Sequence, residues 1–212
     1  MTIFYTASTG NDNLDYAGSE SVYADVLAGN DFVWTGTGND TIFGGNGNDT
    51  LKGYDGHDFI SGDAGNDRIE GETGNDILIG GFGNDTLKGG MGNDRLNGYG
   101  TFANNDGQFD ILEGGAGADT FVLGGGWGVS YNETGDGYAI IADFNYGEGD
   151  KIEVKGSISQ YKLEYTSVSG IGGSALDTEI YFLRAPGNWE RIGIVQDKSG
   201  SQVLLGLDFV FV

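Results

Sequence analysis

Residues 44–52 read GGNGNDTLK, and close copies of this nonapeptide fill most of the first half of the chain. Glycine lies two positions before the aspartate of each copy, and an apolar residue lies two positions after it. Asparagine separates the glycine from the aspartate in seven of the eight copies, and His57 is the exception. The aspartates recur every nine residues, at Asp31, Asp40, Asp49, Asp58, Asp67, Asp76, Asp85 and Asp94. A register kept over eight units indicates a repeat architecture.

Each position of the nonapeptide has a physical role. Glycine permits positive φ and close approach of backbones, so the segment G-x-x-G-N-D favours a tight turn of six residues. The three residues that follow predict a short strand with one apolar side chain pointing inward. The inward residues are Val33, Ile42, Leu51, Ile60, Ile69, Leu78, Leu87 and Leu96. Two layers of such strands predict an all-β fold, a right-handed parallel β-roll with two nonapeptides per coil.

The stacked turns of this roll predict metal sites. Turns on one edge recur every 18 residues, so aspartates of successive coils lie one strand spacing apart, about 4.8 Å. Carboxylates at that distance repel each other unless a cation lies between them. Calcium accepts carboxylate and carbonyl oxygens in flexible geometry, whereas Mg²⁺ demands a stricter octahedron. We therefore predict six Ca²⁺ sites, at the pairs 31/49, 40/58, 49/67, 58/76, 67/85 and 76/94.

The array resumes after seven extra residues between Gly98 and Glu113. Asp110 and Asp119 then occupy the aspartate position, followed by Leu112 and Phe121 as inward residues. The pairs 85/110 and 94/119 predict two more sites. We expect the inserted residues of the 98–113 segment to form a surface loop, with a ligand-contacting loop as the alternative.

The repeat resembles the nonapeptide G-G-x-G-x-D-x-(large apolar)-x of the RTX, or haemolysin-type calcium-binding, family. Residues 44–52 match it fully, as do the repeats that begin at Gly80, Gly89 and Gly114, and the resemblance covers about residues 8–122. It implies calcium bound by the ten aspartates named above and by turn carbonyls. The implied turn positions are Gly44, Asn46, Gly47, Gly53, Asp55, Gly56, Gly62, Ala64, Gly65, Gly71, Thr73, Gly74, Gly80, Phe82, Gly83, Gly89, Met91 and Gly92.

Some copies depart from the family pattern. Tyr54, Asp63 and Glu72 replace the second glycine of their repeats. The first glycine is replaced by Val26 and Thr35. We expect these changes to weaken the sites nearest the start of the chain more than those in the middle.

Composition excludes several classes of partner and site. Of 212 residues, 32 are acidic and 10 are Lys or Arg, a formal net charge of −22, which repels nucleic acid and anionic lipid. The chain has no cysteine, and no apolar stretch long enough to span a bilayer, so we expect no membrane insertion. The N-terminus lacks the basic flank and apolar segment of a Sec-type signal peptide. The family resemblance instead implies a secreted protein, exported by type I machinery and folded outside the cell.

Beyond about residue 123 the repeat ends, so we predict a β-roll over residues 1–122 and a β-rich cap over residues 123–212. Predicted strands cover residues 139–144, 151–154, 161–165, 179–183, 191–195 and 208–212. Asp143 and Asp150 either complete a further calcium site or are solvated acids at strand ends. Asp208, followed by four apolar residues, loosely resembles the export signal at the end of several RTX proteins.

Catalytic patterns are missing from the sequence, and we expect no enzyme. A single histidine, His57, cannot form a zinc triad, and it occupies the asparagine position of a turn, where we expect a solvated side chain. One alternative function is a carbohydrate-facing accessory module, with an extracellular polysaccharide held by Trp127, Tyr131, Tyr138 or the 98–113 loop. Another is ice binding through outward rows of Thr and Asn. The relevant outward position reads Ala28, Thr37, Asn46, Asp55, Ala64, Thr73, Phe82 and Met91, which is not an ordered threonine row.

Overall fold

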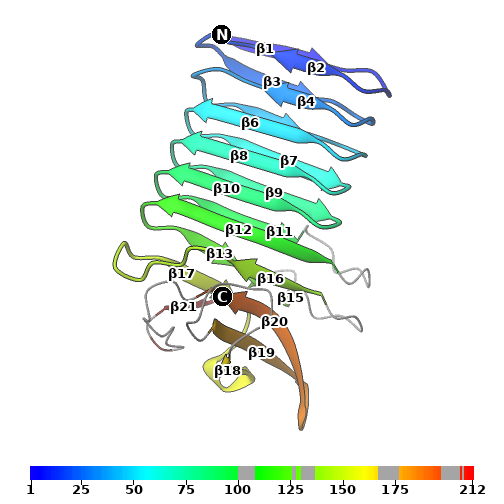
Figure 1. The fold of residues 1–212 in the computed structure, drawn as a ribbon. Helices are drawn as coiled ribbons and strands as arrows, with labels where there is room; N and C mark the ends of the chain where they lie inside the picture. The colour runs from blue at the N-terminus through cyan, green and yellow to red at the C-terminus, as the bar shows by residue number, and fades with distance from the viewer. Residues whose placement is uncertain (100–107, 126–127, 130–136, 167–176, 197–205, 207) are drawn as a thin grey trace.

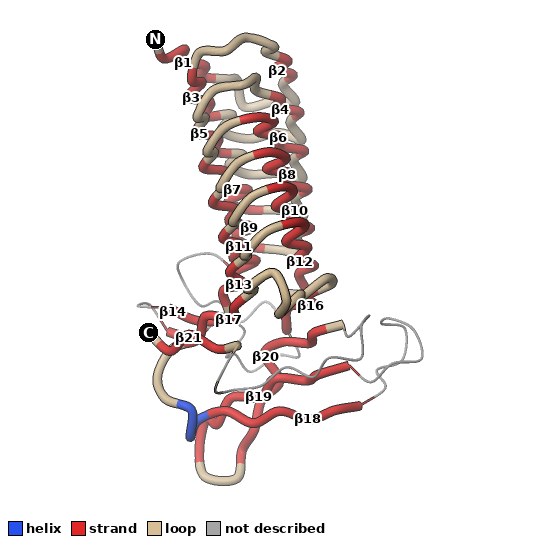
Figure 2. The backbone as a smooth tube through the Cα atoms, turned by 90° about the vertical axis from the view of Figure 1, so that its left-hand side faces the viewer, coloured by secondary structure: helices blue, strands red, loops and turns tan. Residues whose placement is uncertain are grey.

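The computed structural model describes residues 1–212 except 100–107, 126–127, 130–136, 167–176, 197–205 and 207. Its strands form two large sheets that face each other, and the chain alternates between them as it winds along the molecule (Figures 1 and 2). The N-terminal strand lies at one end of the stack and the last strands lie at the other. This is the predicted parallel β-roll.

The first sheet contains nine strands, all paired in parallel. In spatial order they are β1 (Thr2–Thr6), β3 (Ser21–Asp25), β5 (Thr41–Phe43), β7 (Phe59–Ala64), β9 (Ile77–Phe82), β11 (Arg95–Tyr99), β13 (Thr120–Val122), β17 (Lys151–Val154) and β21 (Phe209–Phe211).

The second sheet contains ten strands. In spatial order they are β2 (Asn13–Asp15), β4 (Phe32–Trp34), β6 (Thr50–Asp55), β8 (Arg68–Thr73), β10 (Thr86–Met91), β12 (Phe109–Ala116), β16 (Tyr138–Ile141), β20 (Asn188–Val195), β19 (Asp177–Ala185) and β18 (Tyr161–Thr166). The other described elements are a small ribbon of β14 (Gly124–Gly125) and β15 (Gly128–Val129) and the 3-10 helix η1 (Ile158–Gln160).

Strand register places the repeats in phase. Ile42 pairs with Ile60 and Ile60 with Leu78, an offset of 18 residues at each step, so each coil contains two nonapeptides. The core is a double column of apolar side chains, one from each strand, buried between the sheets. Every predicted inward residue is fully buried, namely Val33, Ile42, Leu51, Ile60, Ile69, Leu78, Leu87, Leu96, Leu112 and Phe121. The sequence prediction of the core is therefore confirmed.

The strands are longer than predicted in the middle of the roll. The expected length was three residues, but β6 to β10 each have six and include the first three positions of the expected turn. Tyr54 pairs with Glu72 and Asp55 with Thr73, so the ladder of hydrogen bonds continues past the first glycine. The prediction of three-residue strands is wrong there because backbone groups between stacked coils pair wherever they can.

All six strands predicted beyond residue 123 are present, within a few residues of their expected ends. Parallel pairing continues there, since β16 and β20 extend the second sheet while β17 and β21 extend the first. Antiparallel pairing joins β18, β19 and β20, and also β14 with β15. The end of the roll is thus covered by strands that first continue it, and the division at residue 122 stays a prediction.

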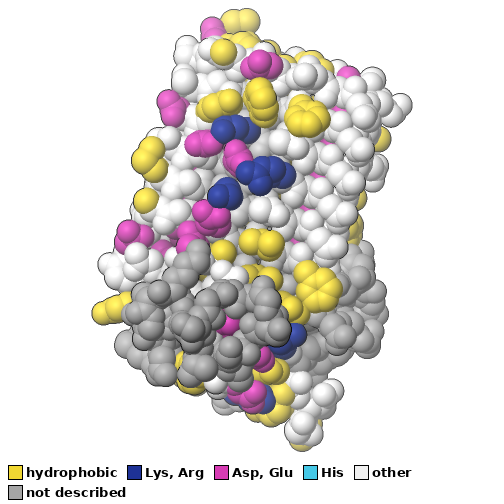
Figure 3. Space-filling model, in the orientation of Figure 1, with side chains coloured by type: hydrophobic (Ala, Val, Ile, Leu, Met, Phe, Trp, Pro, Cys, Tyr) yellow, Lys and Arg dark blue, Asp and Glu magenta, His cyan; other side chains and the backbone are white. Residues whose placement is uncertain are grey.

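Basic and acidic side chains alternate on the outer face of the second sheet. Lys52 is paired with Glu70 and Glu72, and Lys88 with Glu113. Figure 3 shows these basic and acidic side chains gathered in one patch over β6, β8 and β10. Exposed pairs of this kind contribute little to stability, about 0–1 kcal/mol each, so they do not hold the coils together.

Candidate metal centre

The repeat aspartates form two columns, one along each edge of the roll. One carboxylate oxygen of each aspartate, Oδ1, accepts a hydrogen bond from a backbone N–H one coil earlier, which belongs to Val22 at Asp40 and to an aspartate at the other positions. Asp49 N donates to Asp67 Oδ1, and Asp58 N donates to Asp76 Oδ1, at 2.8 and 2.9 Å. The step is 18 residues through most of the array and 25 residues at the pairs 85/110 and 94/119. Each column is therefore continuous across the inserted segment.

The second carboxylate oxygen, Oδ2, is the distinctive atom of the site. The repeat aspartates are at most 3% exposed. Within the described residues, a buried Oδ2 without any hydrogen-bond donor occurs at Asp31, Asp40, Asp49, Asp58, Asp67, Asp76, Asp94 and Asp119. A buried charged oxygen with no partner is costly, so each of these atoms requires a ligand or a proton.

The first glycine of the repeat leaves open space in front of this oxygen. A Cβ atom placed on Gly44 would lie 2.5 Å from Asp49 Oδ2 and 2.8 Å from the carbonyl oxygen of Gly62. The arrangement recurs at Gly62, Gly71, Gly80 and Gly89, each facing the aspartate five positions later and a glycine carbonyl of the next coil. We name this space, bounded by the first glycine, the aspartate Oδ2 and that carbonyl oxygen, the glycine cradle.

The third glycine of the repeat has a different reason to be glycine. Gly47, Gly65 and Gly83 have φ between 113° and 142°, in the region that side chains avoid. A Cβ atom on any of the three would also lie 2.0 Å or less from the carbonyl oxygen of a glycine in the preceding coil. These glycines allow the turns to stack at strand spacing.

Carbonyls at the third position of the repeat are already hydrogen-bonded. The carbonyl oxygens of Asn46, Ala64 and Thr73 each accept a backbone N–H of the preceding coil at 2.7–2.8 Å, and those of Phe82 and Met91 do likewise. A carbonyl oxygen has a second lone pair, so these atoms are able to bind an ion as well. The carbonyls of the first glycines face the cradle directly, and the assignment of individual carbonyl ligands stays a prediction.

Burial shifts the aspartate titrations. It raises the pKa of Asp49 and Asp119 to about 6, and that of Asp58, Asp67 and Asp94 to about 7. The hydrogen bond from the preceding coil lowers each pKa in part, and neighbouring carboxylates raise it again. The columns thus contain carboxylates that resist ionisation at neutral pH when no cation is bound.

These residues fit a hard divalent cation. Carboxylate and carbonyl oxygens are the donor set that Ca²⁺ prefers. Among the described residues no three acidic or histidine side chains converge on one point. An ion in the cradle would therefore be held by aspartate Oδ2 atoms together with backbone carbonyl oxygens, and the ligand set stays a prediction.

Comparison with protein families agrees with this geometry. The model of the RTX calcium-binding nonapeptide repeat matches four copies, over residues 24–51, 43–78, 70–100 and 106–127. The roll is built from RTX calcium-binding repeats. A comparison with curated proteins found no significant match. The matched copies include every repeat aspartate from Asp31 to Asp119, and the roll is referred to below as the RTX roll.

The departures from the repeat pattern affect the cradles in two ways. Val26 and Thr35 place side chains where later coils have the first glycine, and both are buried. Thr35 Oγ1 donates to the carbonyl oxygen of Gly53 at 3.1 Å, an atom that faces the cradle. Tyr54, Asp63 and Glu72 instead adopt positive φ of 68–81° in the position of the second glycine and leave the cradle open.

Sequence reasoning missed two further columns of hydrogen bonds, one on each edge, formed by the residues that precede the repeat aspartates. The side-chain oxygen of Asn48 accepts the backbone N–H of Asn66, and that of Asn66 accepts the backbone N–H of Asn84, at 2.7–2.8 Å. His57 is exposed, as expected, and it belongs to the matching column on the other edge, since its Nδ1 accepts the N–H of Asn75 at 2.8 Å. The asparagine found in seven of eight repeats was the available signal.

Asp143 and Asp150 lie at the end of the columns. Asp150 Oδ1 accepts the N–H of Asp119 at 2.9 Å, and its Oδ2 accepts the N–H of Asn145 at 2.7 Å. Both oxygens of Asp143 accept backbone N–H groups, from Gly114 and Gly115. The structure brings both residues to the RTX roll, with backbone donors on each carboxylate.

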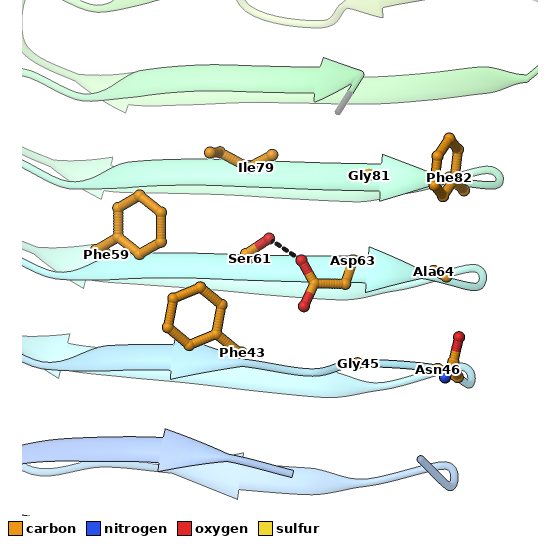
Figure 4. Close-up of a pocket in the computed structure, with 10 residues that line it drawn as sticks. All are labelled: Phe43, Gly45, Asn46, Phe59, Ser61, Asp63, Ala64, Ile79, Gly81 and Phe82. Atoms are coloured by element: carbon orange, nitrogen blue, oxygen red, sulfur yellow. Dashed lines mark hydrogen bonds between the residues drawn. The ribbon is translucent and has the colours of Figure 1, made fainter. Parts of the chain in front are cut away.

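A separate hollow of about 580 Å³ lies on the outer face of the first sheet. Phe43 and Phe59 form its wall, with ring centroids 5.7 Å apart, and Phe82 lies at the turn (Figure 4). Ser61 Oγ donates to Asp63 Oδ1 at 2.6 Å on its floor. Trp127 and Tyr131, which the sequence suggested as sugar contacts, are outside the described residues, and the ring of Tyr138 is covered by Arg191 at 4.2 Å.

Proposed function

We propose that this chain is a secreted calcium-binding RTX module that folds as Ca²⁺ fills its two aspartate columns. The observation that carries the proposal is the row of buried Oδ2 atoms without donors, which from Asp49 onward face the first glycine of their repeat. The carboxylates and carbonyls there supply only acceptors. A bound cation satisfies all of them at once, and no side chain of the repeat does.

Calcium binding then supplies stability that the glycine-rich chain and its thin core do not provide. The chain contains 42 glycines, which lose much conformational freedom on folding, and a core only two side chains thick. A site whose free ligand is at 100 times its dissociation constant contributes about 2.7 kcal/mol to the folded state. Several coupled sites would therefore decide whether the roll folds.

Export before folding is the corresponding proposal for localisation. Strand β21 is hydrogen-bonded to β17, and Asp208 and Phe209 beside it are buried. A C-terminal export signal in this segment would be accessible only in the unfolded chain, as in calcium-poor cytosol. Within the described part of the chain, no helix has the length and apolar character needed to span a bilayer.

Far-UV circular dichroism of the purified chain with chelator and then with added Ca²⁺ tests the proposal. We expect a disordered spectrum in chelator and a β spectrum after Ca²⁺ is added, whereas the same concentration of Mg²⁺ should restore less structure. An identical β spectrum in chelator and in calcium would contradict it.

A second candidate function is binding of a neutral polysaccharide on the first sheet. The hollow beside Phe43 and Phe59 combines aromatic faces with the hydroxyl of Ser61 and the carboxylate of Asp63, which suits sugar rings and their hydroxyls. A row of rings continues from it through Tyr23 to Phe4, with centroids 5.8–5.9 Å apart. Glycan-array binding that is lost in Phe59→Ala supports this function, and no binding by the calcium-loaded wild type removes it.

A further inference from the structure

At one end of an aspartate column the carboxylate has a hydrogen-bond donor that the middle aspartates lack, and Gln108 supplies it. Gln108 occupies the position two before Asp110, where the repeats preceding Asp31 to Asp94 all have glycine. Its side chain is only 2% exposed. A buried amide on the turn side of the column is a departure that the repeat pattern does not require.

The amide nitrogen of Gln108 bridges two acceptors. Its Nε2 donates to Asp110 Oδ2 at 3.1 Å and to the carbonyl oxygen of Gly81, in the preceding coil, at 3.2 Å. Asp110 Oδ1 meanwhile accepts the N–H of Asp85 at 2.8 Å, the same bond that the earlier aspartates of this column form. The Oδ2 that has no donor at Asp49 or Asp67 is therefore hydrogen-bonded at Asp110.

In the described part of the next coil, no carboxylate lies opposite Asp110. Register between β12 and β16 places Ala139 beside Asp110, where earlier coils place an aspartate. On the other edge the column continues one step further, from Asp119 to Asp150. One column therefore stops at Asp110, and the amide lies at its last rung.

Two of the other three column ends have the same arrangement with different donors, whereas Asp40, the first aspartate of its column, has a buried Oδ2 without a donor. Near the N-terminus, Asp12 Oδ2 accepts both the backbone N–H and the hydroxyl of Ser8, each at 2.9 Å. Near the other end, Asp150 Oδ2 accepts the N–H of Asn145. In each case a protein donor satisfies the oxygen that faces an open cradle in the middle coils.

We propose that Gln108 closes one calcium column, its amide group replacing the cation at Asp110 so that this carboxylate binds no ion. The inference rests on the proposed calcium columns. An amide NH₂ has two N–H donors, which match one carboxylate oxygen and one carbonyl oxygen. The amide oxygen of Gln108, Oε1, is itself buried without a donor. A neutral cap at the last rung ends the column without a half-coordinated cation or an unpaired buried charge.

Calcium counts from native mass spectrometry of the full chain test this role. Gln108→Glu exchanges the NH₂ donor for a carboxylate oxygen at nearly the same size, so two carboxylates and the Gly81 carbonyl would then require a cation. We expect one more bound ion than in the wild type. Gln160→Glu, the same change at a residue of η1 far from the columns, is the control and should leave the count unchanged.

Gln108→Ala separates this role from that of a metal ligand. An amide that merely replaces the cation can be removed without losing an ion, so the count should equal or exceed that of the wild type. One ion fewer in Gln108→Ala, or an unchanged count in Gln108→Glu, would overturn the inference. A wild-type chain that binds no calcium would instead defeat the proposed function, so the two failures are distinguishable.

Discussion

The backbone N–H of Asp49 donates to Oδ1 of Asp67 at 2.8 Å, and the two residues are 18 positions apart in the sequence. This bond joins one coil to the next through an atom that is also part of a metal-binding group. Because Asp67 Oδ1 is held by the protein, Oδ2 is held in turn toward the glycine cradle at Gly62. Hydrogen bonding and the proposed ion binding are thus divided between the two oxygens of one carboxylate.

Replacing Asp67 by Asn separates these two roles. The amide oxygen of Asn can still accept the N–H of Asp49, but its NH₂ group would place a donor where an ion needs an acceptor. We expect one fewer bound Ca²⁺ and a calcium midpoint of folding raised by at least about tenfold, the loss that follows even from changes around metal ligands. Native mass spectrometry and a calcium titration followed by circular dichroism measure both.

Asp15→Asn is the matched control for that variant. Asp15 is an exposed residue at the end of β2, and the substitution removes the same charge. It should leave the number of ions unchanged. Equal ion counts in Asp67→Asn and the wild type would show that Asp67 Oδ2 is not a ligand.

Gly62→Ala tests the cradle without disturbing the backbone, since Gly62 does not have positive φ. The added methyl group would lie 2.6 Å from the Gly80 carbonyl oxygen and closer still to Asp67 Oδ2. We expect one fewer ion and a loss of about 1–3 kcal/mol in the free energy of unfolding at saturating calcium, the usual cost of overpacking. Gly206→Ala, which meets no atom within 4 Å, should cost much less.

Much of this arrangement could be predicted from the sequence because the repeat length fixes it. A step of nine residues places every second aspartate on the same edge, and one apolar residue per strand defines the core. The exact donors could not be predicted in this way. Whether Oδ1 or Oδ2 of Asp67 accepts the N–H of Asp49 depends on side-chain rotation within the stack, which no spacing encodes.

The ends of the roll were harder to predict for a related reason. Asp110 follows Asp85 by 25 residues and Asp150 follows Asp119 by 31, so neither step carries the nine-residue signal. Gln108 is hydrogen-bonded to Gly81, 27 residues earlier, across that irregular step. The pair 85/110 was predicted by resuming the array after the insertion, but only three-dimensional pairing of the strands reveals that Asp150 follows Asp119 and that Gln108 contacts Gly81.

His57 provides a test of the column that it forms with Asn39 and Asn75. Its N–H donates to Asn39 and its Nδ1 accepts from Asn75, at 3.0 and 2.8 Å. We expect His57→Asn to keep both bonds and leave stability unchanged or higher. His57→Ala removes the acceptor and should cost about 0.5–1.5 kcal/mol. Urea unfolding at saturating calcium compares the three proteins, and equal stability of His57→Ala and the wild type would show that the column contributes nothing at this position.

The raised pKa values of the buried aspartates predict that acid stabilises the fold of the calcium-free chain. Burial raises the pKa of Asp58, Asp67 and Asp94 to about 7 from the ordinary value of 3.8. Between those values the folded chain binds protons that the unfolded chain releases, so acid favours the fold. The stabilisation is complete below about pH 3.8 and is lost as the pH rises through about 7. In calcium-depleted buffer, circular dichroism should therefore show more β structure at about pH 5 than at pH 7.5.

Bound calcium should reverse this trend, because protons then compete with the ion for the same Oδ2 atoms. At a fixed calcium concentration near the folding midpoint, acidification should release bound ions. The increase in β structure that acid causes in the calcium-free chain should then be smaller, or become a decrease. A variant with Asn at positions 58, 67 and 94 should show a weaker pH dependence in calcium-depleted buffer, since the groups that titrate have been removed. Loss of β structure on acidification of the calcium-free wild type would contradict the assignment of these buried carboxylates as the groups that oppose folding at neutral pH.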